Sequence, residues 1–186
     1  MPLSRRRGVH RGFTDCLLQR GARQVFAVDV GHGQLDWGLR NDARVSVLER
    51  LDVRALEPSV VPPCDVVTAD LSFISLRSVL GDLANIGTSD AEFVLLVKPQ
   101  FEAGRAKVGK GGIVRDPAVH AEVLDAVCAA CAEAGLVPVA VCRSPLAGAD
   151  GNVEFLLHCR RTGEPVSASM LREVADIPRE GMNHGG

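Results

Sequence analysis

Three ionisable residues stand at the ends of apolar segments in this sequence, where the ends of β-strands are expected. Asp70 closes the run VVTAD, and Lys98 directly follows the run FVLLV. Glu154 lies in the segment GNVEF, at the start of another apolar run. Ligands of open α/β sheets bind beside the carboxyl ends of the strands. An acid–lysine–acid set at such a rim is suited to moving a proton from a weakly acidic hydroxyl group.

Each of these residues also has an ordinary structural interpretation. Asp70 could cap the following helix, although Ser72 or Ser75 could serve as the cap instead. Lys98 could simply extend its amine into solvent at the rim of the sheet. Glu154 in an apolar strand needs a partner, and a lysine at a neighbouring strand end would provide one. The combination of the three, rather than any one of them, favours chemistry.

A second group of residues is typical of nucleotide binding. Gly12, Phe13 and Thr14 precede a helical pattern, and Asp29 ends the apolar run QVFAVD. Backbone N–H groups at a helix start bind anions, and an acid at the end of the next strand can hold a ribose. The full three-glycine fingerprint is absent, so an acid that only caps the next turn is an equally good interpretation.

The stretch after Lys98 indicates a loop that contacts a ligand. Residues 100–112 contain four glycines, the aromatic Phe101, and the basic residues Arg105, Lys107 and Lys110. Such a loop can contact phosphates and stack on a base. It could also be only a solvated connection, but long loops without a function are uncommon. All three lysines of the chain fall between residues 98 and 110.

The chain as a whole alternates strand-like and helical patterns, which predicts a parallel-rich α/β sheet with helices on both faces. The longest predicted helix is opened by Asp116 and Pro117 and closed by Gly135. The expected strands span residues 24–29, 45–48, 66–70, 92–97, 138–142 and 153–159. The expected helices span residues 13–20, 35–40, 76–83, 119–134 and 169–175.

The N-terminus departs from this pattern. Four arginines lie between residues 5 and 11, where a nucleotide-binding sheet would have its first buried strand. Burying four unpaired charges would be prohibitive, so the first central strand is predicted to be missing or disrupted. We expect an irregular basic segment over residues 1–11, the main domain over residues 12–162, and a C-terminal helix with a frayed tail over residues 163–186.

Composition limits the class of protein. The chain has 186 residues, 46% of them hydrophobic, and a net charge of −2, as in a soluble globular protein. No apolar run approaches the ~20 residues of a membrane span, and no signal peptide is visible, so a cytoplasmic protein is expected. Cys128 and Cys131 lie one helical turn apart and are interpreted as packing residues, and no metal site is predicted. Because the net charge is slightly negative, any RNA binding must depend on local patches.

The segments GFTDCLLQRGARQVFAVDVGHGQ, ADLSFISL, LVKPQFEAGRAKVGKGGIVRDP and GNVEF resemble the TlyA (haemolysin A) family of FtsJ-like ribosomal RNA 2′-O-methyltransferases. The resemblance covers about residues 12–160. It implies a Rossmann-like S-adenosylmethionine (SAM)-dependent methyltransferase sheet whose last strand is antiparallel. It places the first central strand between the strands that end at Asp29 and Asp70. It also implies SAM as cofactor, ribosomal RNA or a ribosomal subunit as partner, and no membrane.

The resemblance assigns roles to individual residues. Three members of the family's catalytic tetrad correspond to Asp70, Lys98 and Glu154. Asp29 corresponds to the acid that holds the SAM ribose, and Asp52 to a contact with the adenine. The other implied cofactor-binding residues are Gly12, Phe13, Thr14, Val30, Asp70 and Leu71. The implied RNA-binding residues are Arg105, Lys107 and Lys110.

The sequence also departs from the family at its N-terminus. Arginines replace the Gly-rich turn, and neither the first lysine of the tetrad nor the S4-type RNA-binding module is seen. We therefore expect weak SAM binding and low activity. The alternatives are a non-catalytic RNA- or ribosome-binding remnant, an NAD-type dehydrogenase and, least favoured, a membrane-lytic haemolysin. The oligomeric state is not predicted.

Overall fold

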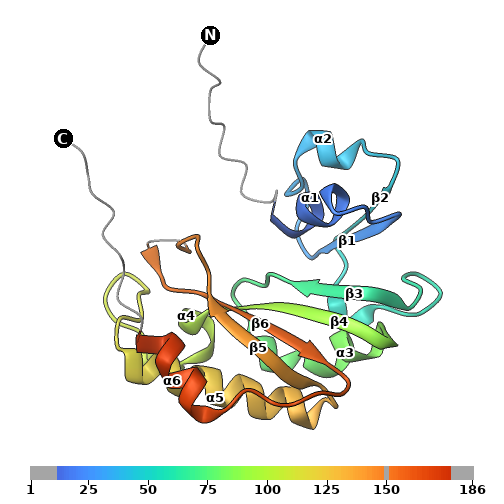
Figure 1. Cartoon of the computed structure of the whole chain (residues 1–186). Helices are drawn as coiled ribbons and strands as arrows, with labels where there is room; N and C mark the ends of the chain where they lie inside the picture. Colours follow the sequence, from blue (N-terminus) through green and yellow to red (C-terminus); the bar gives the residue numbers. More distant parts are fainter. Residues whose placement is uncertain (1–11, 149–150, 177–186) are drawn as a thin grey trace. The chain divides into compact units, whose positions relative to one another are not determined.

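The computed structural model describes residues 12–148 and 151–176 of the chain (Figure 1). The chain divides into two compact units, residues 1–62 and 63–186. All six predicted strands and all five predicted helical segments are present. The irregular segment predicted over residues 1–11 and the frayed tail beyond residue 176 lie outside the described residues. The predicted domain limits at residues 12 and 162 stay a prediction.

The first unit pairs two short parallel strands. They align from Val25 opposite Val45 to Asp29 opposite Glu49, so two carboxylates end the strands side by side. Asp36 begins the short helix between them, because its side chain accepts a 2.9 Å hydrogen bond from the Gly38 N–H. The elements are α1 (Gly12–Gln19), β1 (Val25–Asp29), α2 (Trp37–Arg40), β2 (Val45–Glu49) and the 3₁₀ turn η1 (Val53–Ala55).

The second unit contains a four-stranded mixed sheet in the order β3-β4-β6-β5. β3 and β4 are parallel, whereas β6 runs antiparallel to both β4 and β5. The predicted antiparallel last strand is thereby confirmed. Among the described residues the strands form two separate sheets, one in each unit. The strands are β3 (Cys64–Ala69), β4 (Gly87–Val97), β5 (Val137–Arg143) and β6 (Phe155–Arg160).

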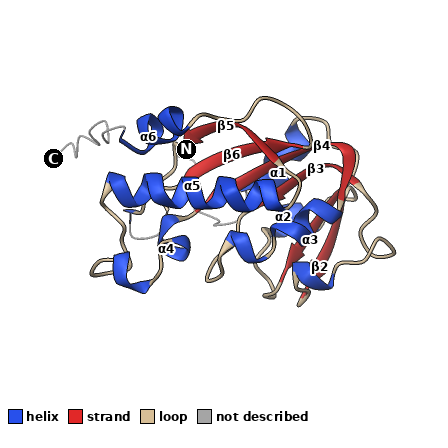
Figure 2. Ribbon diagram, turned by 90° about the horizontal axis from the view of Figure 1, so that it is seen from below, coloured by secondary structure: helices blue, strands red, loops and turns tan. Residues whose placement is uncertain are grey.

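Helices cover one face of this sheet (Figures 1 and 2). Alternate residues of β4 and β6, among them Phe93 and Phe155, are fully buried beneath them. The longest helix, α5, begins where the Asp116 side chain accepts a hydrogen bond from the Ala118 N–H, and it stops before Gly135, whose φ is +74°. The helical elements are η2 (Leu76–Ser78), α3 (Leu80–Asn85), α4 (Pro99–Glu102), η3 (Arg105–Lys107), α5 (Pro117–Glu133) and α6 (Ala168–Asp176).

Cysteines of α5 and β6 belong to the core of this unit. The Cys131 and Cys159 sulfurs lie 3.9 Å apart as free thiols, and both residues are buried. Desolvation raises the pKa of the neighbouring Cys128 thiol to about 12, which is the behaviour of a packing residue. Among the residues that the structure describes, no helix combines the length and the apolar character that a membrane span requires.

Candidate active site

Asp70 and Lys98 meet at the carboxyl ends of two neighbouring parallel strands. Each directly follows its strand, Asp70 after β3 and Lys98 after β4. The Lys98 Nζ lies 2.6 Å from Asp70 Oδ1 and donates a 3.1 Å hydrogen bond to the Ser72 Oγ. The Lys98 side chain is 12% exposed, so its charge is held at the rim with little water around it. The structure therefore brings two of the three predicted catalytic residues into direct contact.

Glu154 reaches the same rim from the opposite strand direction. It precedes β6, and the β4–β6 register places Phe155 opposite Val97, the last residue of β4. The Gln100 Nε2 donates a 3.3 Å hydrogen bond to Glu154 Oε1. Sequence reasoning expected a lysine as the direct partner and missed this glutamine. The amide in the segment KPQF, two residues from Lys98, was the available signal.

Burial dominates the electrostatics of Glu154, which is only 7% exposed. Desolvation raises the pKa of Glu154 above the ordinary range of a glutamate, and the nearby Asp70 carboxylate acts in the same direction. The positive charge of Lys98 and the hydrogen bond from Gln100 oppose this shift. Glu154 therefore takes up a proton at a higher pH than an exposed glutamate does.

Gly148 and Asn152 support this carboxylate, and sequence reasoning missed both. A Cβ atom added to Gly148 would overlap Glu154 Oε1, so a residue larger than glycine would have to displace the carboxylate. The buried Asn152 accepts a 3.1 Å hydrogen bond from the Val114 N–H and donates a 3.0 Å bond to the Gly112 carbonyl. Asn152 thus fastens the end of the glycine-rich loop to the segment that carries Glu154.

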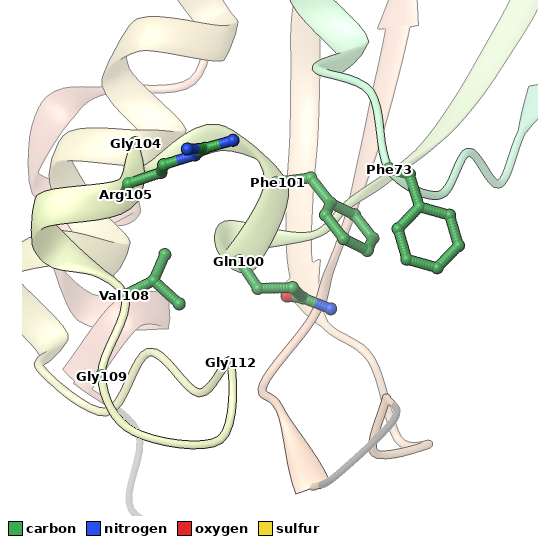
Figure 3. A pocket seen from close by; sticks show the side chains of 8 residues that line it. All are labelled: Phe73, Gln100, Phe101, Gly104, Arg105, Val108, Gly109 and Gly112. Carbon is green, nitrogen blue, oxygen red and sulfur yellow. The ribbon is translucent and has the colours of Figure 1, made fainter.

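An open cavity of about 400 Å³ lies beside this cluster (Figure 3). The Phe73 and Phe101 rings face each other at its edge, with centroids 5.4 Å apart and planes tilted by 51°. Phe73 is 87% exposed, and Lys98 Nζ lies 6.0 Å from the Phe101 centroid. The cavity is lined by Phe73, Gln100, Phe101, Gly104, Arg105, Val108, Gly109 and Gly112.

The three predicted RNA-binding residues occupy different positions in the glycine-rich loop. Arg105 lines the cavity, and Lys110 is exposed near the tip of the loop. Lys107 forms an ion pair with Glu122 of α5, so the positive charge of Lys107 is partly neutralised within the protein. The aromatic pair and Arg105 therefore share one cavity, whereas Lys107 anchors the loop to α5.

The predicted cofactor acids belong to the first unit. Asp29 ends β1, and its Oδ1 accepts a 2.6 Å hydrogen bond from the Gly31 N–H. Asp52 caps η1 and forms an ion pair with Arg54, which lowers the pKa of Asp52 to about 2. A contact between Asp52 and adenine would therefore have to share this carboxylate with Arg54.

The remaining predicted cofactor residues are near element ends. Val30 directly follows β1 and is 70% exposed, and Gly12, Phe13 and Thr14 form the start of α1. Leu71 follows Asp70 in the second unit. Sequence reasoning missed Glu49, whose carboxylate binds Arg40 through two hydrogen bonds and accepts another from the Gly33 N–H. The bond from Arg40 contributes most to lowering the pKa of Glu49 to about 2.

A family model described as FtsJ-like methyltransferase matches residues 11–161. The chain belongs to this family. The FtsJ-like chain is 50% identical over 165 residues to the 16S/23S rRNA (cytidine-2′-O)-methyltransferase TlyA of Mycobacterium tuberculosis, covering 88% of this chain and 62% of that protein. It thus spans about three fifths of the length of this curated relative. The family predicted from the sequence motifs is confirmed.

Solved structures confirm the predicted fold of this FtsJ-like chain. It superimposes with a TM-score of 0.83 on a Streptococcus thermophilus protein provisionally named a hemolysin, with 42% identity over 88% of this chain and 61% of that one. The chain is more distantly similar to the 16S rRNA (adenine(1408)-N(1))-methyltransferase of Catenulisporales acidiphilia. The TM-score is 0.52, the identity is 12%, and 82% of both chains is covered. At that identity the likeness shows the fold alone, which is the Rossmann-like α/β fold of methyltransferases.

Proposed function

We propose that this chain transfers a methyl group from SAM to a ribose 2′-hydroxyl of ribosomal RNA. The observation that carries the proposal is the Lys98 amine, held 2.6 Å from Asp70 at the sheet rim beside an aromatic-edged cavity. Membership of the FtsJ-like family supports the reaction class. The name of the M. tuberculosis relative, which specifies cytidine 2′-oxygens of 16S and 23S rRNA, supports the substrate.

In this mechanism Lys98 receives the hydroxyl group that is to be methylated. An ammonium group has three N–H donors, and Asp70 and Ser72 accept two of them. The third donor is available to the ribose 2′-oxygen and stabilises the negative charge that develops as the hydroxyl loses its proton. When bound, SAM supplies the electrophilic methyl group. Lys98 would hold the 2′-oxygen in place for this transfer, and the proton of the hydroxyl would pass to the solvent or to Glu154.

The cavity fits the base of the target nucleotide. Its volume of about 400 Å³ accommodates one nucleobase, and bases that leave their helix stack on aromatic side chains. Phe73 and Phe101 provide that surface, and Arg105 provides a positive charge for a neighbouring phosphate. We propose that the target nucleotide is single-stranded or displaced from its helix, because the aromatic pair cannot reach a base that is paired and stacked.

The residues at the end of β1 fit the nucleoside part of SAM. The Gly31 N–H fixes the Asp29 carboxylate at the strand end, which is where α/β sheets place the acceptor for ribose hydroxyls. The exposed side chain of Val30 offers apolar surface beside it. We assign Asp29 and Val30 to the ribose and adenine, with Asp52 as a polar contact to the base. The start of α1, at Gly12 to Thr14, completes the proposed SAM-binding set of the first unit.

The proposed partner is ribosomal RNA, free or within a ribosomal subunit, and the proposal implies a cytoplasmic protein. Incubation with radiolabelled SAM and purified 16S and 23S rRNA, followed by nuclease digestion and chromatography, should yield a labelled 2′-O-methyl nucleoside. Isothermal titration should show SAM binding. RNA binding without SAM binding or methyl transfer would contradict the enzymatic proposal and favour a non-catalytic RNA-binding protein.

A further inference from the structure

Glu102, the last residue of α4, has a buried carboxylate that is bonded to the segment following β3. Its side chain is 3% exposed. The Ser75 hydroxyl and the Arg77 Nε donate to Oε2 at 2.6 and 3.1 Å, and the Leu76 N–H donates to Oε1 at 2.5 Å. Arg77 also donates to the backbone carbonyl of Glu102 at 3.1 Å. One carboxylate thus joins two segments that are about 25 residues apart in the sequence.

The two joined segments are those that carry the candidate active site. The segment after β3 contains Asp70, Ser72 and Phe73, and the segment after β4 contains Lys98 and Phe101. Three contacts of the site run between them: Lys98 with Asp70, Lys98 with Ser72, and Phe73 with Phe101. In the described part of the chain, the hydrogen bonds of Glu102 go to Ser75, Leu76 and Arg77 rather than to Lys98 or Phe73, so Glu102 acts on the site through the segments that carry these residues.

Phe73 gives an independent reason to look for such an anchor. Its φ is +68°, in the left-handed region that a phenylalanine rarely adopts. A residue held there is strained and persists only where its surroundings impose the conformation. The ring is 87% exposed, so burial of the side chain cannot hold it. The hydrogen bonds of Glu102 hold Ser75 by its hydroxyl and Leu76 by its backbone N–H, two and three residues further along.

We propose that Glu102 is a positioning residue that holds the Phe73 segment against Lys98 and Phe101, so that the base and the 2′-hydroxyl of one nucleotide are presented together. This inference rests on the proposed RNA methylation. A purely structural role of Glu102 would affect the binding of both ligands alike. The positioning role instead predicts that substitution of Glu102 changes the KM for RNA more than the KM for SAM. Asp29 and Val30, the residues proposed to hold the SAM nucleoside, are not among the hydrogen-bond partners of Glu102 in the described part of the chain.

The test uses the Glu102→Gln variant, which keeps the size of the side chain but places an NH₂ group against the Ser75 and Arg77 donors. Hydrogen–deuterium exchange should become faster in residues 71–78 and stay unchanged in β5 and β6. In the methylation assay the KM for RNA should rise and kcat should fall, together by about 10²-fold in kcat/KM, as expected for a displacement near 1 Å. The KM for SAM should change less than twofold.

Two further variants keep the test decisive. Arg77→Ala leaves the Ser75 and Leu76 bonds in place, so it should change kcat/KM much less than Glu102→Gln does. Ser75→Ala removes a single bond and serves if Glu102→Gln does not fold. Unchanged exchange in residues 71–78, or equal changes in the KM values for RNA and SAM, would overturn the inference. Absence of methyl transfer by the unaltered chain would count against the proposed function, while the exchange result would still decide the positioning role.

Discussion

Replacing Lys98 by methionine removes the amine but keeps an unbranched side chain of similar length beside Phe101. The variant loses the ion pair with Asp70 and the hydrogen bond to Ser72. Asp70 is 38% exposed and regains water, so the free energy of unfolding should fall by only about 1 kcal/mol. This corresponds to a Tm decrease of about 2–4 °C for a domain of this size.

The effect of Lys98→Met on activity should be far larger than its effect on stability. A group that assists proton removal contributes about 10²–10⁴-fold to the rate. The barrier should therefore rise by about 2.7–5.4 kcal/mol, at 1.36 kcal/mol for each factor of ten. Single-turnover methyl transfer at saturating SAM and RNA measures this change, and thermal unfolding of the same samples measures the stability.

A matched control separates chemistry from the loss of an ion pair. Arg160→Met removes an ion pair with Glu92 at the opposite end of β4 and β6, so it should retain methyl transfer. Lys98→Arg keeps the positive charge but alters the position of the donors, and we expect it to recover only part of the activity. If Lys98→Met retains more than half of the rate, or Arg160→Met loses as much as Lys98→Met, the assignment of Lys98 is wrong.

Three further predictions concern Gly148, Glu154 and Asp29. Gly148→Ala places a Cβ against Glu154 Oε1 and should reduce methyl transfer by about tenfold or more. The control Gly81→Ala adds its Cβ to open space within α3 and should retain the rate; equal rates of the two variants would show that Gly148 does not position Glu154. Because burial raises the pKa of Glu154 in the folded state, the folded chain binds the extra proton between the ordinary and the raised pKa, and its stability falls as the pH rises through that window. Urea unfolding should therefore show Glu154→Gln gaining stability relative to wild type from pH 4 to pH 8, and a constant difference would refute this. Asp29→Ala should weaken SAM binding at least about tenfold, because it removes charge-assisted hydrogen bonds to the ribose. Isothermal titration measures this change, and Asp42→Ala in the same unit should keep the SAM affinity. Equal affinities of the two variants would reject Asp29 as the ribose acceptor.

The strand ends could be predicted from the sequence because strands buried in an α/β sheet are continuous apolar runs. Asp70 and Lys98 each follow such a run directly, and adjacent parallel strands bring the two residues to one rim. Glu154 could be placed from the start of its run once the last strand was expected to be antiparallel. The longest helix was recognisable because Asp116, Pro117 and Gly135 mark both of its ends.

The supporting contacts could not be predicted, because they depend on side chains from segments that are distant in sequence. Gln100 bonds to Glu154 across 54 residues, and Asn152 bonds to Val114 across 38. Neither residue type has a periodicity that indicates its partner. Lys107 was grouped with the RNA-binding residues from its position in a basic loop, and its ion pair with Glu122 depends on how that loop folds onto α5. Gly148 shows the same limit, since its sequence neighbours give no sign of the carboxylate beside it.

The reversed direction of β6 has a consequence for how the active site can vary among related chains. Since β6 enters the sheet at the rim where β3 and β4 leave it, Glu154 is attached before its strand, whereas Asp70 and Lys98 are attached after theirs. The pairing of Val97 with Phe155 fixes the spacing between Lys98 and Glu154 through the buried core alone. The connections on the rim side, residues 103–111 and 144–147, are therefore free to change length or composition without shifting that spacing. Recognition of different RNA sites can diverge in these connections while the reaction geometry stays the same.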